Sequence, residues 1–308
     1  MTASHLVVEQ SGLHTTVQDE GRWGAQHLGV PVGGALDLHS LHRANLLVGN
    51  RPGEAALEVT LTGCVLRATG DVHLAVTGAR FALHVHADGE IGVRAQSVPM
   101  DRAFLLPAGA RLAIGRRESG ARAYVAVRGG IDTSVVLGSR SAWPLLTRRG
   151  ALTDGTVLAV GTRAVAPVRT AAMPAPAVRD VLRVLPTYEG TRSADVLAAL
   201  CETHGYRVGA GANRMAYLLE DGPTVRLVEP RRPPCGTVNG ALQILPSGLP
   251  VLLMAERQTT GGYPAAAVVI TADLPHAAQL APGARVRFVP CTRDEARAAL
   301  LTSTAGTR

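Results

Sequence analysis

Short runs in which an apolar residue recurs at every second position constrain the fold of this chain more than any other feature. They cover residues 57–61, 72–76, 81–85 and 123–127. A period of two, repeated about every ten residues and separated by glycine, is typical of a β-sandwich or β-barrel. Turns are predicted at Gly63, Gly70, Gly78, Asp88–Gly89 and Gly129–Gly130.

One helix is predicted inside this strand-rich region, beginning after the N-cap Asp37 and ending at Gly49. Later in the chain a strand is expected over residues 181–185. It precedes a helix that begins at Ser193 and stops at Gly205. Asp273 is expected to cap a short helix. Thr292 and Glu295 form a capping box for the last one.

A stretch rich in proline and alanine, without periodicity, covers residues 166–180 and is typical of a linker. The length of 308 residues is enough for two ordinary domains. We therefore predict an N-terminal domain over residues 1–165 and a C-terminal domain over residues 181–308. Both are expected to be mainly β with short helices.

Composition excludes several classes of protein. Hydrophobic residues make up 46% of the chain, which rules out global disorder. No apolar stretch reaches the roughly 18 residues of a membrane span, and no secretory signal is recognisable, so a cytoplasmic protein is expected. The net charge is +7, but the arginines are scattered and aromatic residues make up only 3%. A nucleic-acid surface combines a basic stripe with stacking aromatics, so none is expected.

The cysteines form no CxxC pair and have no histidine at ligand spacing, so no metal site is expected. They are predicted to be reduced thiols. Cys235 lies in the loop 233–236 and leaves a catalytic thiol open as an alternative, although nothing in the sequence supplies its base.

Three segments carry polar and glycine residues that a core or a simple turn does not need. In the first, over residues 12–37, Gln18, Asp19 and Arg22 can supply an amide, a carboxylate and a guanidinium to one pocket. The alternative is a cluster of β-turns with a structural Asp–Arg pair. The second is the Asn213–Arg214 pair, which can fix a carboxylate or carbonyl or can cap the backbone.

The third segment covers residues 256–264 and follows the most apolar strand of the second half. Gln258, Thr259 and Thr260 stand beside Gly261–Gly262, so both side chains and backbone N–H groups can face a ligand. A rigid strand that ends in such residues is typical of a binding loop. A tight hairpin would explain the glycines but not the polar run before them.

Together these segments resemble the family of the 5-oxoprolinase C subunit, also known as allophanate hydrolase subunit 2 or the biotin-dependent carboxyltransferase-like (KipA-type) family. The likeness runs in order over about residues 5–290. The matching motifs lie at residues 12–24, 29–37, 45–50, 57–58, 129–141, 183–186, 213–217 and 257–264. The chain departs from the family pattern at residues 187–190, at Ala216 and over residues 228–235, which leaves another lactam or amide substrate open.

The resemblance implies two cyclophilin-like β-barrel domains and an enzyme that opens the lactam of 5-oxoproline to glutamate with ATP. It implies a B-subunit partner (allophanate hydrolase subunit 1, KipI-type), together with an A-type partner, and ATP bound by the assembled complex. One alternative is the carboxyltransferase half-site of a urea-carboxylase-like system, with carboxybiotin supplied by another protein. Another is a non-catalytic regulator that binds a KipI-like kinase inhibitor.

These considerations assign roles to individual residues. Catalytic roles are predicted for Gln18, Asp19, Arg22, Gln258 and Thr260. Substrate-binding roles are predicted for Asn213, Arg214, Tyr217, Gln243, Arg257, Thr259, Gly261, Gly262 and Tyr263.

Overall fold

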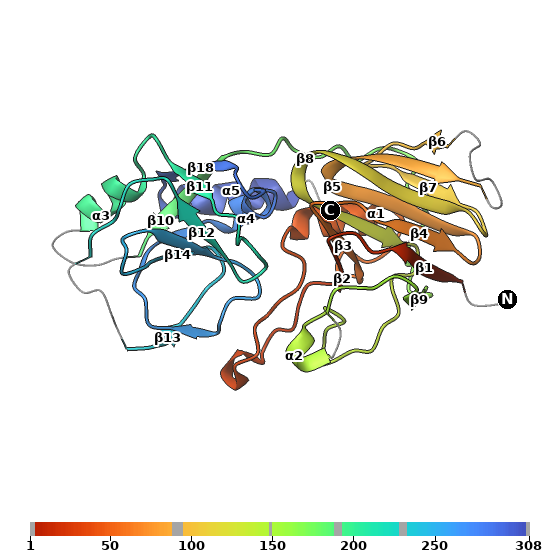
Figure 1. Cartoon of the computed structure of the whole chain (residues 1–308), viewed down its shortest axis with the longest axis horizontal. Coiled ribbons are helices and arrows are strands. Elements are labelled where there is room, and N and C mark those ends of the chain that lie inside the picture. The colour runs from red at the N-terminus through yellow and green to blue at the C-terminus, as the bar shows by residue number, and fades with distance from the viewer. Residues whose placement is uncertain (1–3, 88–94, 148–149, 188–192, 228–232, 306–308) are drawn as a thin grey trace. The chain divides into compact units, whose positions relative to one another are not determined.

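The chain divides into two compact units in its computed structural model, which describes residues 4–87, 95–147, 150–187, 193–227 and 233–305 (Figure 1). The first unit comprises Met1–Arg22 and Asp37–Ala177. The second comprises Trp23–Leu36 and Val178–Arg308. The change of unit after residue 177 falls inside the linker expected from the sequence. The segment Trp23–Leu36, however, belongs with the C-terminal half of the chain, although the boundaries expected from the sequence include it in the first domain.

The strands of the first unit form one curled antiparallel sheet in the order β2–β3–β8–β4–β1–β9, and β5 pairs with β6, β7 and β8. The bounds are β1 His5–Gln10, β2 His14–Gln18, β3 Ala56–Thr60, β4 Val65–Ala68, β5 Val72–His86, β6 Gln96–Ser97, β7 Ala103–Leu106, β8 Arg111–Val127 and β9 Val157–Ala159.

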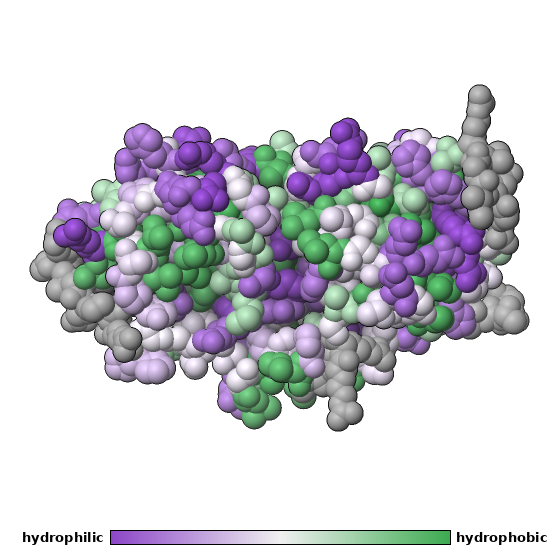
Figure 2. Space-filling model, in the orientation of Figure 1, coloured by the Kyte–Doolittle hydropathy of each residue, from purple (hydrophilic) through white to green (hydrophobic). Residues whose placement is uncertain are grey.

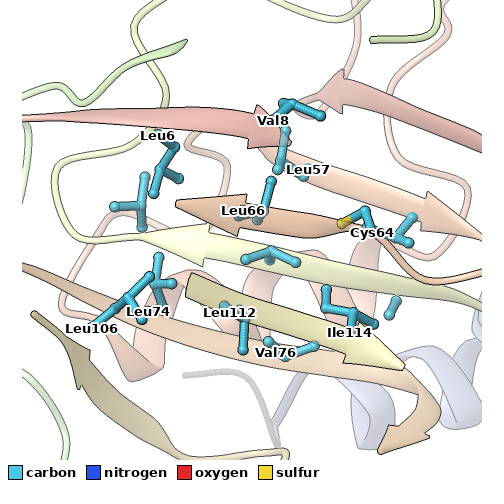
Figure 3. Close-up of a cluster of buried hydrophobic side chains, with 14 of the residues drawn as sticks. Leu6, Val8, Leu57, Cys64, Leu66, Leu74, Val76, Leu106, Leu112 and Ile114 are labelled. Carbon is cyan, nitrogen blue, oxygen red and sulfur yellow. The ribbon is translucent and has the colours of Figure 1, made fainter. Parts of the chain in front are cut away.

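Alternation along these strands builds the core of the first unit. Leu57 on β3, Leu66 on β4 and Leu74 on β5 are completely buried. Figure 3 shows these side chains gathered on one side of the sheet with others from β1, β7 and β8. Each fully buried leucine stabilises the fold by about 1.5–3 kcal/mol relative to an exposed one.

The turn predicted at Gly78 is wrong. A single strand, β5, runs from Val72 to His86 through this position. Its register with β8 shifts between Gly78 and Arg80 and again before Leu83, so the strand is bulged there. Gly78 has a φ of 90°, which glycine adopts readily and other residues rarely do. The expected turn at Asp88–Gly89 lies outside the described residues.

The helix predicted after Asp37 is confirmed as α1, Leu38–Leu47, which packs against β5 and β8. The carboxylate of Asp37 accepts a hydrogen bond from the backbone N–H of Ser40 at 2.9 Å, as an N-cap does. Gly49 follows the helix with a φ of 77°. Helix α2, Pro144–Thr147, also belongs to this unit.

The second unit is a closed barrel in the order β10–β17–β14–β15–β12–β11–β18, with β18 returning to β10 as a parallel neighbour. A separate ribbon pairs β13 with β16. The bounds are β10 Val181–Pro186, β11 Tyr206–Val208, β12 Ala216–Glu220, β13 Cys235–Gly236, β14 Ala241–Ile244, β15 Pro250–Leu253, β16 Thr260–Gly261, β17 Ala265–Val269 and β18 Arg285–Pro290.

Short helices accompany the barrel, and Thr292 and Glu295 form the predicted capping box. The Thr292 N–H donates to Glu295 Oε2 at 2.7 Å, and the Glu295 N–H donates to Thr292 Oγ1 at 3.2 Å. The Asp273 side chain makes no cap. It accepts two hydrogen bonds from the Arg183 guanidinium instead. The bounds are η1 Gln26–Leu28, α3 Ser193–Leu200, η2 Thr271–Asp273, α4 Leu274–Ala278 and α5 Arg293–Ala305.

The predicted fold class, mainly β with short helices and barrel-type sheets, is confirmed. Helix α3 ends at Leu200, earlier than the predicted stop at Gly205. Across the described residues, no helix is long and apolar enough to cross a membrane. The same residues contain no group of three or more histidine, cysteine, aspartate or glutamate side chains that could hold a metal ion.

Candidate functional site

The carboxylate of Asp19, which follows β2 in the first unit, accepts several hydrogen bonds from residues 139–141. We call Asp19 and these residues the polar anchor. Its Oδ1 accepts hydrogen bonds from the hydroxyls of Ser139 and Ser141, each at 2.6 Å. Its Oδ2 accepts from the backbone N–H of Arg140 at 2.5 Å, and the N–H of Gly21 donates to Oδ1 at 2.8 Å. Asp19 therefore fixes the loop 139–141 against the end of β2.

The two other predicted catalytic residues of this unit are buried beside the anchor. Arg22 is 1% exposed, and its guanidinium donates to the carbonyl of Ser141. Gln18 is completely buried, and its Nε2 donates to Thr16 Oγ1 at 3.0 Å. Among the described residues, Gln18 Oε1 has no hydrogen-bond partner. The carboxylate of Asp19 and the guanidinium of Arg22 thus both bind the loop 139–141, whereas the amide of Gln18 binds Thr16.

In the second unit, Arg214 joins three segments that are distant in sequence. Its Nε donates to Glu256 Oε1 at 2.7 Å, and its Nη2 donates to the carbonyl of Gly34 at 2.6 Å. The N–H of Gly33 donates to the carbonyl of Ala255 at 3.1 Å. The arginine is 6% exposed, so these are buried, charge-assisted contacts. They hold the segment Trp23–Leu36 to the end of β15.

The backbone of the loop 257–264, called the polar loop from here on, is fixed at several points. Residues 260–261 form β16, which pairs with β13. The N–H of Thr237 donates to the carbonyl of Thr259 at 3.0 Å, and its hydroxyl donates to the carbonyl of Gln258. Gln243 Nε2 donates to the carbonyl of Tyr263 at 3.1 Å. These hydrogen bonds hold the backbone of the polar loop in one conformation.

The side chains of the polar loop are available to a ligand. Gln258, Thr260 and Tyr263 are exposed, and the side chains of Gln258 and Thr260 make no hydrogen bond within the described part of the chain. Thr259, Gly261 and Gly262 are half-buried. Because the loop backbone is fixed, the exposed amide of Gln258 and hydroxyl of Thr260 present hydrogen-bond donors and acceptors at defined positions.

Arg257, at the start of the polar loop, differs from Arg183, Arg207 and Arg214, which each bind a carboxylate. Its Nη2 donates to the carbonyl of Thr237 at 3.3 Å, and its buried Nε has no partner among the described residues. Burial lowers the pKa of Arg257 below its ordinary value. Within the described residues, the guanidinium is held by one long hydrogen bond and retains unused donor capacity.

Two predicted substrate-binding residues occupy structural positions. Tyr217 is completely buried and packs in the barrel core. The amide oxygen of Asn213 accepts from the N–H groups of Met215 and Ala216 at 2.8 and 3.3 Å, which makes a local turn before β12. The alternative interpretation of Asn213 as a backbone cap thus matches its geometry.

Several residues that build these sites carry little signal in the sequence. Ser139 and Ser141 belong to no hydrolase motif, and no local pattern marks them as partners of Asp19. Thr237 has no distinguishing feature beyond its place between Cys235 and the next strand. Cys235 is exposed on β13, opposite Gly261. Of the departures from the family pattern, residues 188–190 and 228–232 lie outside the described residues.

The surface of the second unit combines polar and apolar areas. Figure 2 shows hydrophobic side chains gathered over the strands labelled β10, β12 and β14 in Figure 1. In the segment Trp23–Leu36, Trp23 and Leu28 are 71% and 65% exposed.

The fold and the two polar sites agree with one family of proteins. Residues 28–290 match the family described as "Carboxyltransferase domain, subdomain A and B". The chain belongs to this family. The relationship inferred from the motifs is therefore confirmed.

Individual relatives refine the comparison. The chain is 34% identical over 297 residues to the 5-oxoprolinase C subunit of Escherichia coli (strain K12), covering 94% of this chain and 93% of the relative. It is 31% identical over 292 residues to the 5-oxoprolinase C subunit of Haemophilus influenzae, covering 91% and 89%. The crystal structure of the K. lactis urea amidolyase superimposes with a TM-score of 0.89 at 25% identity. It covers all of this chain, which spans 20% of that protein.

Proposed function

We propose that this protein is the C subunit of an ATP-dependent 5-oxoprolinase, or of a close relative that acts on another lactam or amide. It works only together with a B-subunit partner, and an A-type partner completes the enzyme. The observation that carries the proposal is the polar loop, whose backbone is fixed while Gln258 and Thr260 remain exposed. Its support from the comparisons is the similarity to two proteins named as C subunits of 5-oxoprolinase over nearly their whole length.

The chemistry of lactam opening requires an activated carbonyl. The amide of Gln258, the hydroxyl of Thr260 and the glycine backbone can donate hydrogen bonds to the lactam oxygen. Because negative charge develops on that oxygen during attack, donors fixed in advance stabilise the transition state more than the ground state. In this proposal Thr259, Gly261, Gly262 and Tyr263 shape the site around the substrate, and Gln243 orients the loop.

The first unit contributes its buried anchor to the proposed enzyme. Catalytic roles are predicted for Gln18, Asp19 and Arg22, but the Asp19 carboxylate is occupied by Ser139 and Ser141. We propose that this group positions the loop 139–141. Gln18 is completely buried, so its amide is proposed to support the same region rather than to touch a reactant.

ATP is assigned to the assembled complex. The sequence contains neither a GxxxxGK[ST] nor a GxGxxG motif, and it contains no lysine at all. No step on this chain is therefore assigned to ATP. We propose that the exposed Trp23 and Leu28 contribute to the surface that contacts a partner. A cytoplasmic location is consistent with four free cysteines, which are typical of a reducing compartment.

A second candidate function is the carboxyltransferase half-site of a biotin-dependent system. It is favoured by the family description and by the TM-score of 0.89 with the urea amidolyase structure. A chain without lysine cannot carry biotin on its own side chain, so another protein would supply carboxybiotin. The third candidate, a regulator that sequesters a KipI-like kinase inhibitor, would leave the polar loop without a catalytic task.

Reconstitution separates these candidates. The purified chain is mixed with its B-type partner, with and without the A-type partner, and ATP hydrolysis that depends on 5-oxoproline is measured. Activity only in the complete mixture supports the first function. Carboxyl transfer from carboxybiotin to urea supports the second. Complex formation without either reaction supports the regulator. If the chain and its co-expressed B-type partner elute separately in size-exclusion chromatography, all three are contradicted.

A further inference from the structure

Arg257 is the half-buried arginine of the second unit whose charge is not matched by a carboxylate of the described residues. The three others that are buried or half-buried in this part of the structure are all paired. Arg183 binds Asp273 at 2.6 and 3.0 Å, Arg207 binds Glu220 at 3.0 Å and Asp221 at 2.5 Å, and Arg214 binds Glu256 at 2.7 Å.

The nearest carboxylate in sequence does not serve Arg257. Glu256 precedes it directly, but its Oε1 accepts from Arg214. The contact that Arg257 does make is with a neutral group, the carbonyl of Thr237, at 3.3 Å. Its Nε is buried and has no partner among the described residues.

An unmatched guanidinium in this position is energetically unfavourable. Arginine stays charged at neutral pH even when burial opposes the charge. Burying a charge without a counter-ion is costly, so a bound anion would relieve an existing cost as well as make new contacts. The planar fork of N–H groups is matched best by a carboxylate, which can accept two parallel hydrogen bonds.

We propose that Arg257 binds the carboxylate group of a small carboxylic acid whose reacting carbonyl lies against the polar loop. The inference rests on the proposed function in taking the loop as the substrate site, and it adds the residue that recognises the carboxylate of such a substrate. An acid is then preferred over the corresponding uncharged amide or lactam. Arg257 is a specificity-determining residue, while Gln258 and Thr260 face the carbonyl.

The test compares two ligands that differ in the carboxylate. Binding of 5-oxoproline and of 2-pyrrolidinone, the same lactam without its carboxylate, is measured by calorimetry on the full chain, alone and with its B-type partner. Wild type is expected to prefer 5-oxoproline. Arg257→Gln is expected to lower the affinity for 5-oxoproline by about tenfold to hundredfold, as for a lost hydrogen bond to a charged group. The affinity for 2-pyrrolidinone is expected to stay unchanged.

Control variants separate recognition from folding. Arg207→Gln removes an equal charge from a paired arginine of the same unit and is expected to leave both affinities unchanged. Arg257→Lys keeps the charge without the fork and should bind 5-oxoproline with intermediate affinity. It also serves as the variant for comparison if Arg257→Gln does not fold.

Competition with bicarbonate tests whether Arg257 also binds a small anion without a lactam ring. Bicarbonate that displaces 5-oxoproline from wild type but not from Arg257→Gln also supports a carboxylate site at Arg257. The inference would be overturned if Arg257→Gln lost affinity for both lactams equally. It would also be overturned if wild type, alone and with its B-type partner, failed to bind 5-oxoproline at millimolar concentration. Because binding is measured without turnover, an absence of ATP hydrolysis contradicts the proposed function and leaves this inference standing.

Discussion

Arg214 donates a hydrogen bond at 2.6 Å to the carbonyl of Gly34, a residue 180 positions earlier in the sequence. The same guanidinium binds Glu256, next to the polar loop. Three motifs that the sequence shares with its family, around residues 29–37, 213–217 and 257–264, therefore meet in the second unit. The glycine that precedes Gly34 adds a backbone hydrogen bond to Ala255.

Arg214→Met is expected to destabilise the protein by about 3–5 kcal/mol, because it leaves the carboxylate of Glu256 without its counter-ion. Urea unfolding followed by circular dichroism measures the loss. The double variant Arg214→Met with Glu256→Gln should recover part of it, since no lone charge remains. Arg207→Met, which breaks pairs more exposed to solvent than Arg214–Glu256, is the control and should change stability less. Equal effects of the two single variants would contradict the expectation.

Gly261→Ala is expected to displace the polar loop and lower activity. A Cβ at Gly261 would lie 2.8 Å from Gln243 Nε2 and 3.2 Å from Thr237 Cγ2. Both side chains hold the loop backbone, so neither can move without breaking a hydrogen bond. Gly236→Ala on the paired strand is the matched control, because nothing lies within 4 Å of its added Cβ. Reconstituted turnover of both variants is compared, and equal turnover would argue against a constrained loop.

Gln258→Ala and Thr260→Val are expected to reduce turnover with little loss of folding stability. Losing one positioned hydrogen bond to a developing charge costs about 3 kcal/mol, or about a hundredfold in rate. Losing an ordinary hydrogen bond costs about 0.5–1.5 kcal/mol of stability. Turnover and melting temperature are both measured on the assembled complex. Variants that melt early but keep wild-type turnover at low temperature would indicate a structural loop.

The free energy of unfolding is expected to fall as the pH rises above 9.0, partly because of Cys64. Burial raises the pKa of this thiol from 9.0 to about 12. Between these values the unfolded chain has lost a proton that the folded chain keeps. Each pH unit therefore removes about 1.4 kcal/mol of stability per such group. Below pH 9.0 the contribution is intact.

Cys64→Ala tests this dependence, because it removes the ionisable group and leaves the other buried groups that titrate at high pH. Denaturant titrations at a series of alkaline pH values should give a shallower decline for Cys64→Ala than for wild type. The variant is also expected to be less stable at neutral pH, where the buried sulfur contributes packing. A decline identical to that of wild type would show that Cys64 does not titrate as its burial indicates.

Local patterns are sufficient to predict much of the fold. Alternation predicts the strands because it reflects which face of a sheet is buried, and the capping residues predict helix starts because each cap is satisfied within one turn. The bulge at Gly78 is not predictable in this way. A glycine in a strand pattern allows either a turn or a bulge, and pairing with the distant β8 decides between them.

The sequence predicts which residue types form the candidate site, but it does not predict which residues each of them contacts. The polar run Gln258–Thr260 is recognisable because a core does not need it. The engagement of Asp19 by Ser141 joins residues 122 positions apart, which no local pattern encodes. The lack of a carboxylate for Arg257 among the described residues is likewise a property of the folded chain, since Glu256 stands beside it in the sequence.

The discontinuity of the second unit has a consequence for how the protein is made. Trp23–Leu36 is translated early, but the rest of its unit begins only at Val178, after all of the first unit has been translated. At ordinary elongation rates this interval is on the order of ten seconds. During it the segment, with Trp23 and Leu28, has no barrel to bind, so it is open to chaperones.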